Sequence, residues 1–178
     1  MKSEKSSKGL IVSYFGNGKG KTTAALGLAL RASGYNKKIL IIQFVKGDWK
    51  TGEEKAVKRL KTVKLIKSGA GFVGIQGDKK PLETHQKAAQ KGLALAQKSL
   101  PNYEIIILDE ILGAIKGGLV KTSDVLKIID LKPKNTILVL TGRPKIDPIL
   151  KKSDLITQMR SIKHPFDKGE LALQGIDY

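Results

Sequence analysis

Short apolar runs recur along this chain, and longer stretches with a helical spacing of apolar residues separate them. Continuous runs of aliphatic residues are typical of strands that are buried on both faces of a parallel sheet. The longest run is 38–45, Lys-Ile-Leu-Ile-Ile-Gln-Phe-Val. By this pattern the predicted strands are residues 10–14, 38–45, 63–66, 103–110, 136–140 and 154–159.

The stretches between these runs are predicted to be helices. The clearest is 81–100, which begins at a proline, a favourable first helical residue, and then repeats apolar positions every three or four residues. His85 falls on the apolar face, so we expect it to pack rather than to catalyse. The other predicted helices are residues 24–33, 53–60, 111–116, 123–130 and 147–152.

Strands that alternate with helices predict a three-layer α/β fold, in which a mainly parallel sheet carries helices on both faces. Ligands of such sheets bind along the carboxyl ends of the strands. The chain has no internal repeat and no sign of a second domain. The predicted domain covers residues 10–178, residues 1–9 are a flexible tail, and residues 162–178 show little regular pattern.

Composition adds a strong positive charge. The 178 residues carry a formal net charge of +17, yet only four of the 33 basic residues are arginine. Nucleic-acid recognition favours arginine and a basic helix or stripe, whereas these lysines are scattered along the chain. A solvated lysine-rich surface is therefore favoured over a nucleic-acid partner.

Other features exclude whole classes of protein. The chain has no cysteine, which excludes disulfides and thiolate metal sites. Its first residues are polar, and no apolar run approaches the roughly 20 residues that cross a membrane. We expect a cytoplasmic protein with no membrane partner.

The strongest motif is residues 16–23, Gly-Asn-Gly-Lys-Gly-Lys-Thr-Thr, between a predicted strand and a predicted helix. We call it the phosphate loop, because glycines, free amides and a helix N-terminus together bind polyphosphates. Lys21 adds a charge on the phosphates, and the Thr22 hydroxyl can ligate Mg²⁺. The usual loop has its first glycine one residue earlier, where this chain has Phe15. A dinucleotide fingerprint is set aside, because it needs a glycine in place of Lys21.

A second signal is the pair Asp109 and Glu110 at the end of a buried run. Such an acid completes the Mg²⁺ site that the loop threonine begins, although Asp-Glu after a strand can also cap the next helix. Arg143 follows the strand 136–140 to the same edge, where it is placed to meet a phosphate or is simply an exposed arginine. His164 precedes a proline and is predicted to be structural.

Together these residues resemble the P-loop type of ATP:corrinoid adenosyltransferase, also called cob(I)alamin adenosyltransferase. The shortened phosphate loop is the form that this family has. The resemblance covers nearly the whole chain and rests on residues 16–25, 28–32, 43–47 with Trp49, 52–53, 107–111, 140–143, 163–167 and 174–178.

The resemblance implies that a Co(I) corrinoid, either cobalamin or cobyrinic acid a,c-diamide, attacks C5′ of ATP and expels triphosphate in cobalamin biosynthesis. It also implies ATP as co-substrate with Mg²⁺ or Mn²⁺, a homodimer and a flavoprotein reductant. Catalysis would then involve Lys21, Thr22 and Glu110, and the metal would be held by Thr22 and Glu110 with Asp109 nearby. The expected ligand-binding residues are Gly16, Asn17, Gly18, Lys19, Gly20, Lys21, Thr22, Thr23, Arg31, Phe72 and Arg143.

Two features depart from the family pattern. The family's loop after the third strand has a Phe and a Trp two residues apart that press on the corrin, whereas this chain has Phe72 and Gly74. Some relatives also have a longer N-terminal segment. The alternatives are a P-loop kinase or ATPase, which would release ADP, and an ATPase stimulated by nucleic acid.

Overall fold

The computed structural model describes residues 8–47, 50–71, 73 and 77–177. Its centre is a six-stranded sheet with the order β3-β2-β4-β5-β1-β6, and all five neighbouring pairs run parallel. Because every strand points the same way, all the loops that follow the strands meet at one edge. The strands are β1 (Ile11–Phe15), β2 (Ile39–Gln43), β3 (Val63–Lys67), β4 (Ile105–Asp109), β5 (Ile137–Gly142) and β6 (Leu155–Gln158).

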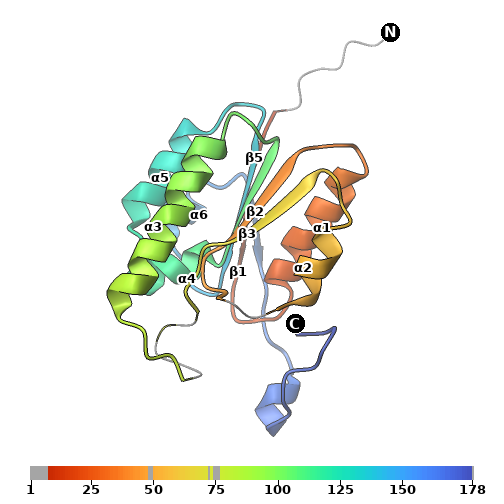
Figure 1. Cartoon of the computed structure of the whole chain (residues 1–178), viewed down its shortest axis with the longest axis vertical. Coiled ribbons are helices and arrows are strands. Elements are labelled where there is room, and N and C mark those ends of the chain that lie inside the picture. The colour runs from red at the N-terminus through yellow and green to blue at the C-terminus, as the bar shows by residue number, and fades with distance from the viewer. Residues whose placement is uncertain (1–7, 48–49, 72, 74–76, 178) are drawn as a thin grey trace.

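Helices cover both faces of the sheet, which confirms the three-layer α/β prediction (Figure 1). α1 (Lys21–Ser33) and α2 (Gly52–Val57) lie on one face. The helices on the other face are α3 (Leu82–Ser99), α4 (Ile111–Lys116), α5 (Thr122–Leu131) and α6 (Asp147–Leu150).

The core consists of two apolar layers, one on each face of the sheet. Alternate residues of β2 point to opposite layers: Leu40 and Ile42 pack with α3 and α4, whereas Ile39 and Ile41 pack with α1. Both faces of the strand are buried, which is why its sequence is a continuous apolar run rather than an alternating one.

The predicted elements are confirmed, with differences at their ends. β2 ends at Gln43 rather than at residue 45, because the chain bends at residues 44–45, although the Phe44 amide still donates to the Asp109 carbonyl (3.0 Å). β4 covers only Ile105–Asp109 of the predicted 103–110. Gly9, assigned to the flexible tail, is buried and its amide donates to the Lys134 carbonyl (2.7 Å).

The last strand and the segment after it are the most exposed part of the described chain. All four residues of β6 are exposed, since β6 is an edge strand and pairs with β1 alone among the described strands. After it, Pro165–Lys168 forms a short 3-10 helix. His164 caps this helix: its Nδ1 accepts the Phe166 amide (3.2 Å), and its own amide donates to Asp167 (3.1 Å). His164 is therefore structural, as predicted.

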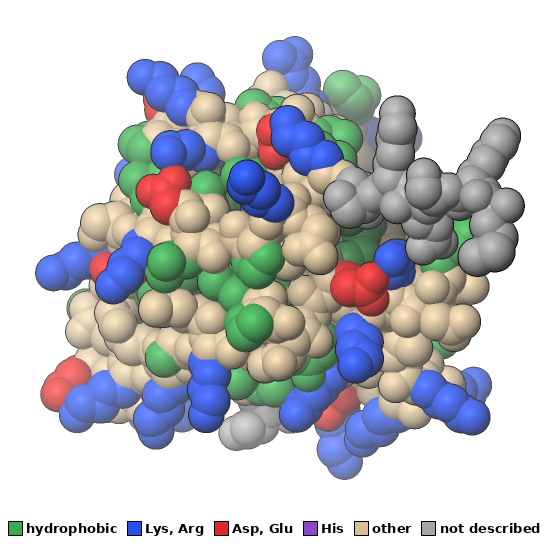
Figure 2. Space-filling model, turned by 90° about the horizontal axis from the view of Figure 1, so that it is seen from above, with side chains coloured by type: hydrophobic (Ala, Val, Ile, Leu, Met, Phe, Trp, Pro, Cys, Tyr) green, Lys and Arg blue, Asp and Glu red, His purple; other side chains and the backbone are tan. Residues whose placement is uncertain are grey.

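Basic side chains are spread over the surface. Figure 2 shows lysine and arginine around much of the outline of the face seen from above, interleaved with acidic side chains. They form no continuous basic stripe on this face, as the scatter of lysines in the sequence predicts. Among the described residues, no helix is both long enough and apolar enough to span a bilayer.

Candidate active site

The phosphate loop lies at the carboxyl edge of the sheet, between β1 and α1. Its first two glycines fit tightly against the backbone that follows β5 and β6. The Gly16 amide donates to the Arg143 carbonyl (3.1 Å), and the Gly18 amide donates to the Met159 carbonyl (2.9 Å). A Cβ at Gly16 would lie 2.3 Å from the Met159 oxygen, so no larger residue fits there. These two glycines anchor the loop, and the loop amides that follow them lead into the N-terminus of α1.

Lys21 is the first residue of α1 and is buried. Its Nζ donates to the carbonyl of Gly18, 2.7 Å away, so the ammonium lies over the loop. Burial lowers the pKa of Lys21, while the nearby carboxylate of Glu110 acts in the opposite direction. A buried ammonium facing a concave loop is well placed to bind a phosphate group.

Asp109 connects three elements of the site. Its Oδ1 accepts hydrogen bonds from the hydroxyls of Thr22 and Thr141, each at 2.8 Å. Its Oδ2 accepts from the Gln43 amide nitrogen at 3.2 Å. The side chain is buried, so these donors replace the water that an ionised carboxylate needs. Asp109 thereby fixes the phosphate loop to the ends of β2 and β5.

Glu110 follows in an unusual backbone conformation, with φ at 62°. Non-glycine residues rarely adopt positive φ, and such strain is concentrated at functional sites. Its amide donates to the Thr141 hydroxyl (2.9 Å), and the small residue Gly113 leaves room for its carboxylate. Burial, followed by the negative charge of Asp109, raises the pKa of Glu110. A bound cation would therefore stabilise the ionised form of this carboxyl group.

A hollow of about 470 Å³ opens over these residues. Seven predicted site residues line it: Lys19, Gly20, Lys21, Thr22, Thr23, Glu110 and Arg143. The rim also carries the ion pair of Lys46 with Glu53. The remaining lining residues are Leu26, Gly52, Gly175, Ile176 and Asp177. The last three come from the C-terminal segment, whose residues 174–178 contribute to the family resemblance but were not predicted to line the site.

The oxygen atoms at the base of the hollow suit a hard cation. Thr22 and Glu110 both line it, and Asp109 lies directly behind them. The Gln43 Oε1, beside Asp109, is buried and has no hydrogen-bond partner among the described atoms. No group of three or more His, Cys, Asp or Glu is found in the described part of the chain that could hold a metal alone. Few protein ligands together with substrate phosphates is the usual arrangement for Mg²⁺, so the residues fit that ion.

The structure separates some predicted residues from the hollow. Arg31 is exposed in the last turn of α1, ten residues beyond Lys21, which is about 15 Å along a helix axis. Asn17 is exposed on the outside of the loop and does not line the hollow. Phe72 and Gly74 lie outside the described residues, so the prediction for the corrin-facing loop is not tested here.

His85 packs as predicted and also has a partner. It is buried, and its Nε2 lies 3.0 Å from Asp78 at the end of the loop between β3 and α3.

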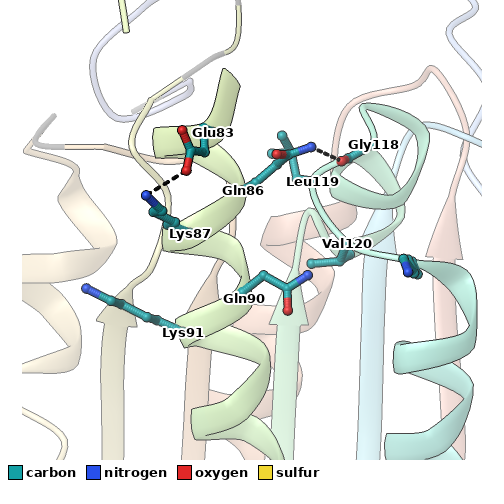
Figure 3. A pocket seen from close by; sticks show the side chains of 9 residues that line it. Glu83, Gln86, Lys87, Gln90, Lys91, Gly118, Leu119 and Val120 are labelled. Atoms are coloured by element: carbon teal, nitrogen blue, oxygen red, sulfur yellow. Dashed lines mark hydrogen bonds and ion pairs between the residues drawn. The ribbon is translucent and has the colours of Figure 1, made fainter. Parts of the chain in front are cut away.

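A second hollow, about 620 Å³, lies between α3 and the turn that follows α4 (Figure 3). Across this hollow the Gln86 side-chain amide donates to the Gly118 carbonyl (3.0 Å), and Lys87 forms an ion pair with Glu83. This hollow contains none of the predicted site residues.

Comparison with known proteins finds similar sequences along nearly the whole chain. Residues 7–178 match the family model described as ATP:corrinoid adenosyltransferase BtuR/CobO/CobP. The chain is 32% identical to the corrinoid adenosyltransferase of Escherichia coli strain K12 and to that of Salmonella typhimurium strain LT2. Each alignment covers 96% of this chain and 86% of the relative.

Solved structures support the fold alone. The RadB recombinase has a TM-score of 0.52 at 13% identity, covering 88% of this chain and 77% of that one. The KaiC-like protein PH0186 from Pyrococcus horikoshii OT3 has a TM-score of 0.50 at 14% identity, covering 86% and 73%. At these identities the likeness extends to the α/β architecture and no further.

Proposed function

This chain belongs to the ATP:corrinoid adenosyltransferase family, and from that premise we propose that the phosphate loop, Glu110 and Arg143 carry its reaction. The activity is ATP-dependent transfer of the adenosyl group to a corrinoid. The observation that most supports the assignment of residues is the shared hollow, in which a buried lysine, a threonine hydroxyl and a carboxylate meet at the phosphate loop.

In the proposed reaction the Co(I) centre of the corrinoid donates an electron pair to C5′ of ATP. A cobalt–carbon bond forms, the C5′–oxygen bond breaks, and triphosphate leaves with the bonding pair, so that cobalt is formally oxidised to Co(III). The nucleophile carries no proton, and therefore no side chain has to act as a general base. The protein has to align the reactants and stabilise the charge of the leaving group.

Four residues of the hollow have a part in that task, with Asp109 behind them. The Lys21 ammonium, which donates a hydrogen bond to the Gly18 carbonyl (2.7 Å), exchanges this bond for one to a phosphate oxygen. Arg143 meets the same phosphates from the end of β5, since a guanidinium binds two oxygens at once. Thr22 and Glu110 would hold Mg²⁺ or Mn²⁺, with Asp109 as the acceptor behind them. The ion would supply positive charge to the triphosphate.

The test is an anaerobic incubation of the protein with MgATP and chemically reduced cob(I)alamin. We expect light-sensitive adenosylcobalamin and an equal amount of triphosphate. Lys21→Ala should reduce the rate by about 100-fold or more, as the loss of a group that stabilises transition-state charge does. Lys152→Ala is the matched control, because Lys152 pairs with Asp130 on the surface and precedes β6, at the edge of the sheet opposite the phosphate loop.

Two outcomes would contradict the proposal. ADP without a cobalt–carbon bond would indicate a kinase or an ATPase instead. Equal rates for Lys21→Ala and Lys152→Ala would show that Lys21 of the phosphate loop does not contribute to the reaction. The same assay run with cobyrinic acid a,c-diamide in place of cobalamin identifies the preferred corrinoid.

We also propose that the protein is a cytoplasmic homodimer that receives its reduced corrinoid from a flavoprotein. The dimer is supported by the open edge of β6, where Leu155 and Ile156 are 43% and 48% exposed. An uncovered apolar edge strand is a surface that pairs with another chain. Light scattering should give twice the mass of one chain, and Ile156→Lys should halve it, while Leu131→Lys on α5 should not. A dimer that survives Ile156→Lys would exclude this edge as the interface.

A further inference from the structure

The C-terminal segment ends in a tight turn, residues 173–177, which we call the tail turn. The amide of Asp177 donates to the Leu173 carbonyl (2.8 Å), and the Leu173 amide donates back to Oδ2 of Asp177 (2.8 Å). The other carboxylate oxygen, Oδ1, pairs with Nζ of Lys19. Asp177 therefore closes the turn with one oxygen and fastens it to the phosphate loop with the other.

This contact lies inside the proposed nucleotide site. Gly175, Ile176 and Asp177 line the same hollow as Lys21 and Arg143. Lys19 belongs to the phosphate loop itself, so its ammonium is one of the charges that a bound polyphosphate would meet. In the structure that charge is already neutralised by Asp177, which occupies the place of an anionic ligand.

The residues around the Lys19–Asp177 ion pair add little stability to it. Leu171 is 86% exposed and Ile176 64% exposed, so the segment around Asp177 buries little apolar surface. The ion pair itself is partly open to solvent on both sides. Exposed ion pairs contribute little to stability, because water and salt compete with them. A ligand with several negative charges can therefore displace Asp177 from Lys19.

We propose that Asp177 competes with the bound nucleotide's phosphates for Lys19: it pairs with Lys19 in the ligand-free protein, and a polyphosphate has to displace it to bind. The inference rests on the proposed function, since it requires that the phosphates of ATP bind at the phosphate loop. Displacement favours ligands with a high phosphate charge. When triphosphate leaves, Asp177 pairs with Lys19 again, which lowers the affinity of the loop for its product.

Asp177 is ionised in neutral solution, and the hydrogen bond from Lys19 lowers its pKa further, so the competing charge persists in more acidic solution. The substitution Asp177→Asn removes this competing charge and keeps the size of the side chain. Asp167→Asn is the matched control, because it makes the same change in the same segment, at the 3-10 helix cap, and Asp167 does not line the hollow.

The experiment is calorimetric titration of the full-length protein with inorganic triphosphate in Mg²⁺ buffer at low salt. Asp177→Asn should bind triphosphate about two- to five-fold more tightly than the wild type. This is the change in affinity that corresponds to the free energy of an exposed ion pair. Asp167→Asn should bind like the wild type. Equal or weaker binding by Asp177→Asn would overturn the inference and indicate that the tail turn is a fixed wall of the site.

A double-mutant cycle separates an effect through Lys19 from a general effect of charge. In a Lys19→Met background, Asp177→Asn should no longer tighten binding, because the competition has already been removed. A full effect in that background would also overturn the inference. Failure of the proposed function has a different signature: the wild type would then not bind triphosphate, or Lys21→Ala would bind it as well as the wild type.

Discussion

The substitution Thr141→Val tests whether the hydrogen bonds behind the loop hold the site together. The Thr141 hydroxyl is fully buried, donates to Asp109 (2.8 Å) and accepts the amide of Glu110 (2.9 Å). Valine has nearly the same shape and can do neither. The change therefore removes one hydrogen bond to the Asp109 carboxylate and one from the Glu110 backbone amide, without opening a cavity.

The magnitude follows from the two bonds. A hydrogen bond to a charged group contributes about 1.5–3 kcal/mol, and one between neutral groups about 0.5–1.5 kcal/mol. The added methyl group recovers about 0.8 kcal/mol through burial. We therefore expect Thr141→Val to lower the free energy of unfolding by about 1–4 kcal/mol. Activity should fall as well, because Glu110 loses the contact that holds its strained backbone.

The assay is urea unfolding of the ligand-free protein, followed by circular dichroism, with the slope of the transition compared between variants. Thr136→Val is the matched control. Thr136 is also buried, but its hydroxyl makes only a long contact of 3.5 Å with the Tyr103 carbonyl. We expect it to cost less than about 1 kcal/mol. Equal losses for the two variants would refute the reasoning, since the cost would then come from replacing any buried threonine.

Three further predictions concern single positions. Gly27 lies inside α1 with open space where a Cβ would stand, so Gly27→Ala should raise the free energy of unfolding by about 0.5–1 kcal/mol in the same urea assay. Gly142 has φ at 152°, and a Cβ there would lie 2.8 Å from the Gly113 amide nitrogen, so Gly142→Ala should lower it by about 2–3 kcal/mol. The raised pKa of Glu110 means that its ionised form costs stability once the pH exceeds the ordinary value of 4.5, and increasingly as the pH rises through the raised pKa. Glu110→Gln should therefore unfold at higher urea than the wild type at neutral pH without Mg²⁺, and at the same urea below about pH 4.5; no difference at neutral pH would contradict the assigned burial cost.

Much of the fold could be predicted because its signals are local. Continuous aliphatic runs such as 38–45 gave the strands, and the glycines with Lys21 and Thr22 gave the phosphate loop. The order of the strands could not be predicted, because it depends on which long-range pairs form. The sequence therefore gave no sign that β1 lies between β5 and β6.

The site was predicted in part for the same reason. Asp109 and Glu110 follow a buried run directly, whereas Gln43 and Thr141 become site residues only when β2, β4 and β5 lie side by side. A signal was present, since each is a polar residue at the end of an apolar run. Asp177 had no such signal: it lies 158 residues from Lys19, and only the folded chain brings the two together.

The position of β1 in the sheet has a consequence for synthesis on the ribosome. The phosphate loop is made early, yet both neighbours of β1 and the carbonyls of Arg143 and Met159 that anchor the loop come from the last third of the chain. At about 5–20 residues per second, that part follows roughly 6–30 s later. The nucleotide site therefore cannot assemble before the last third of the chain has been made, and a truncated product that has the whole glycine-rich motif but lacks β5 and β6 should fail to retain ATP.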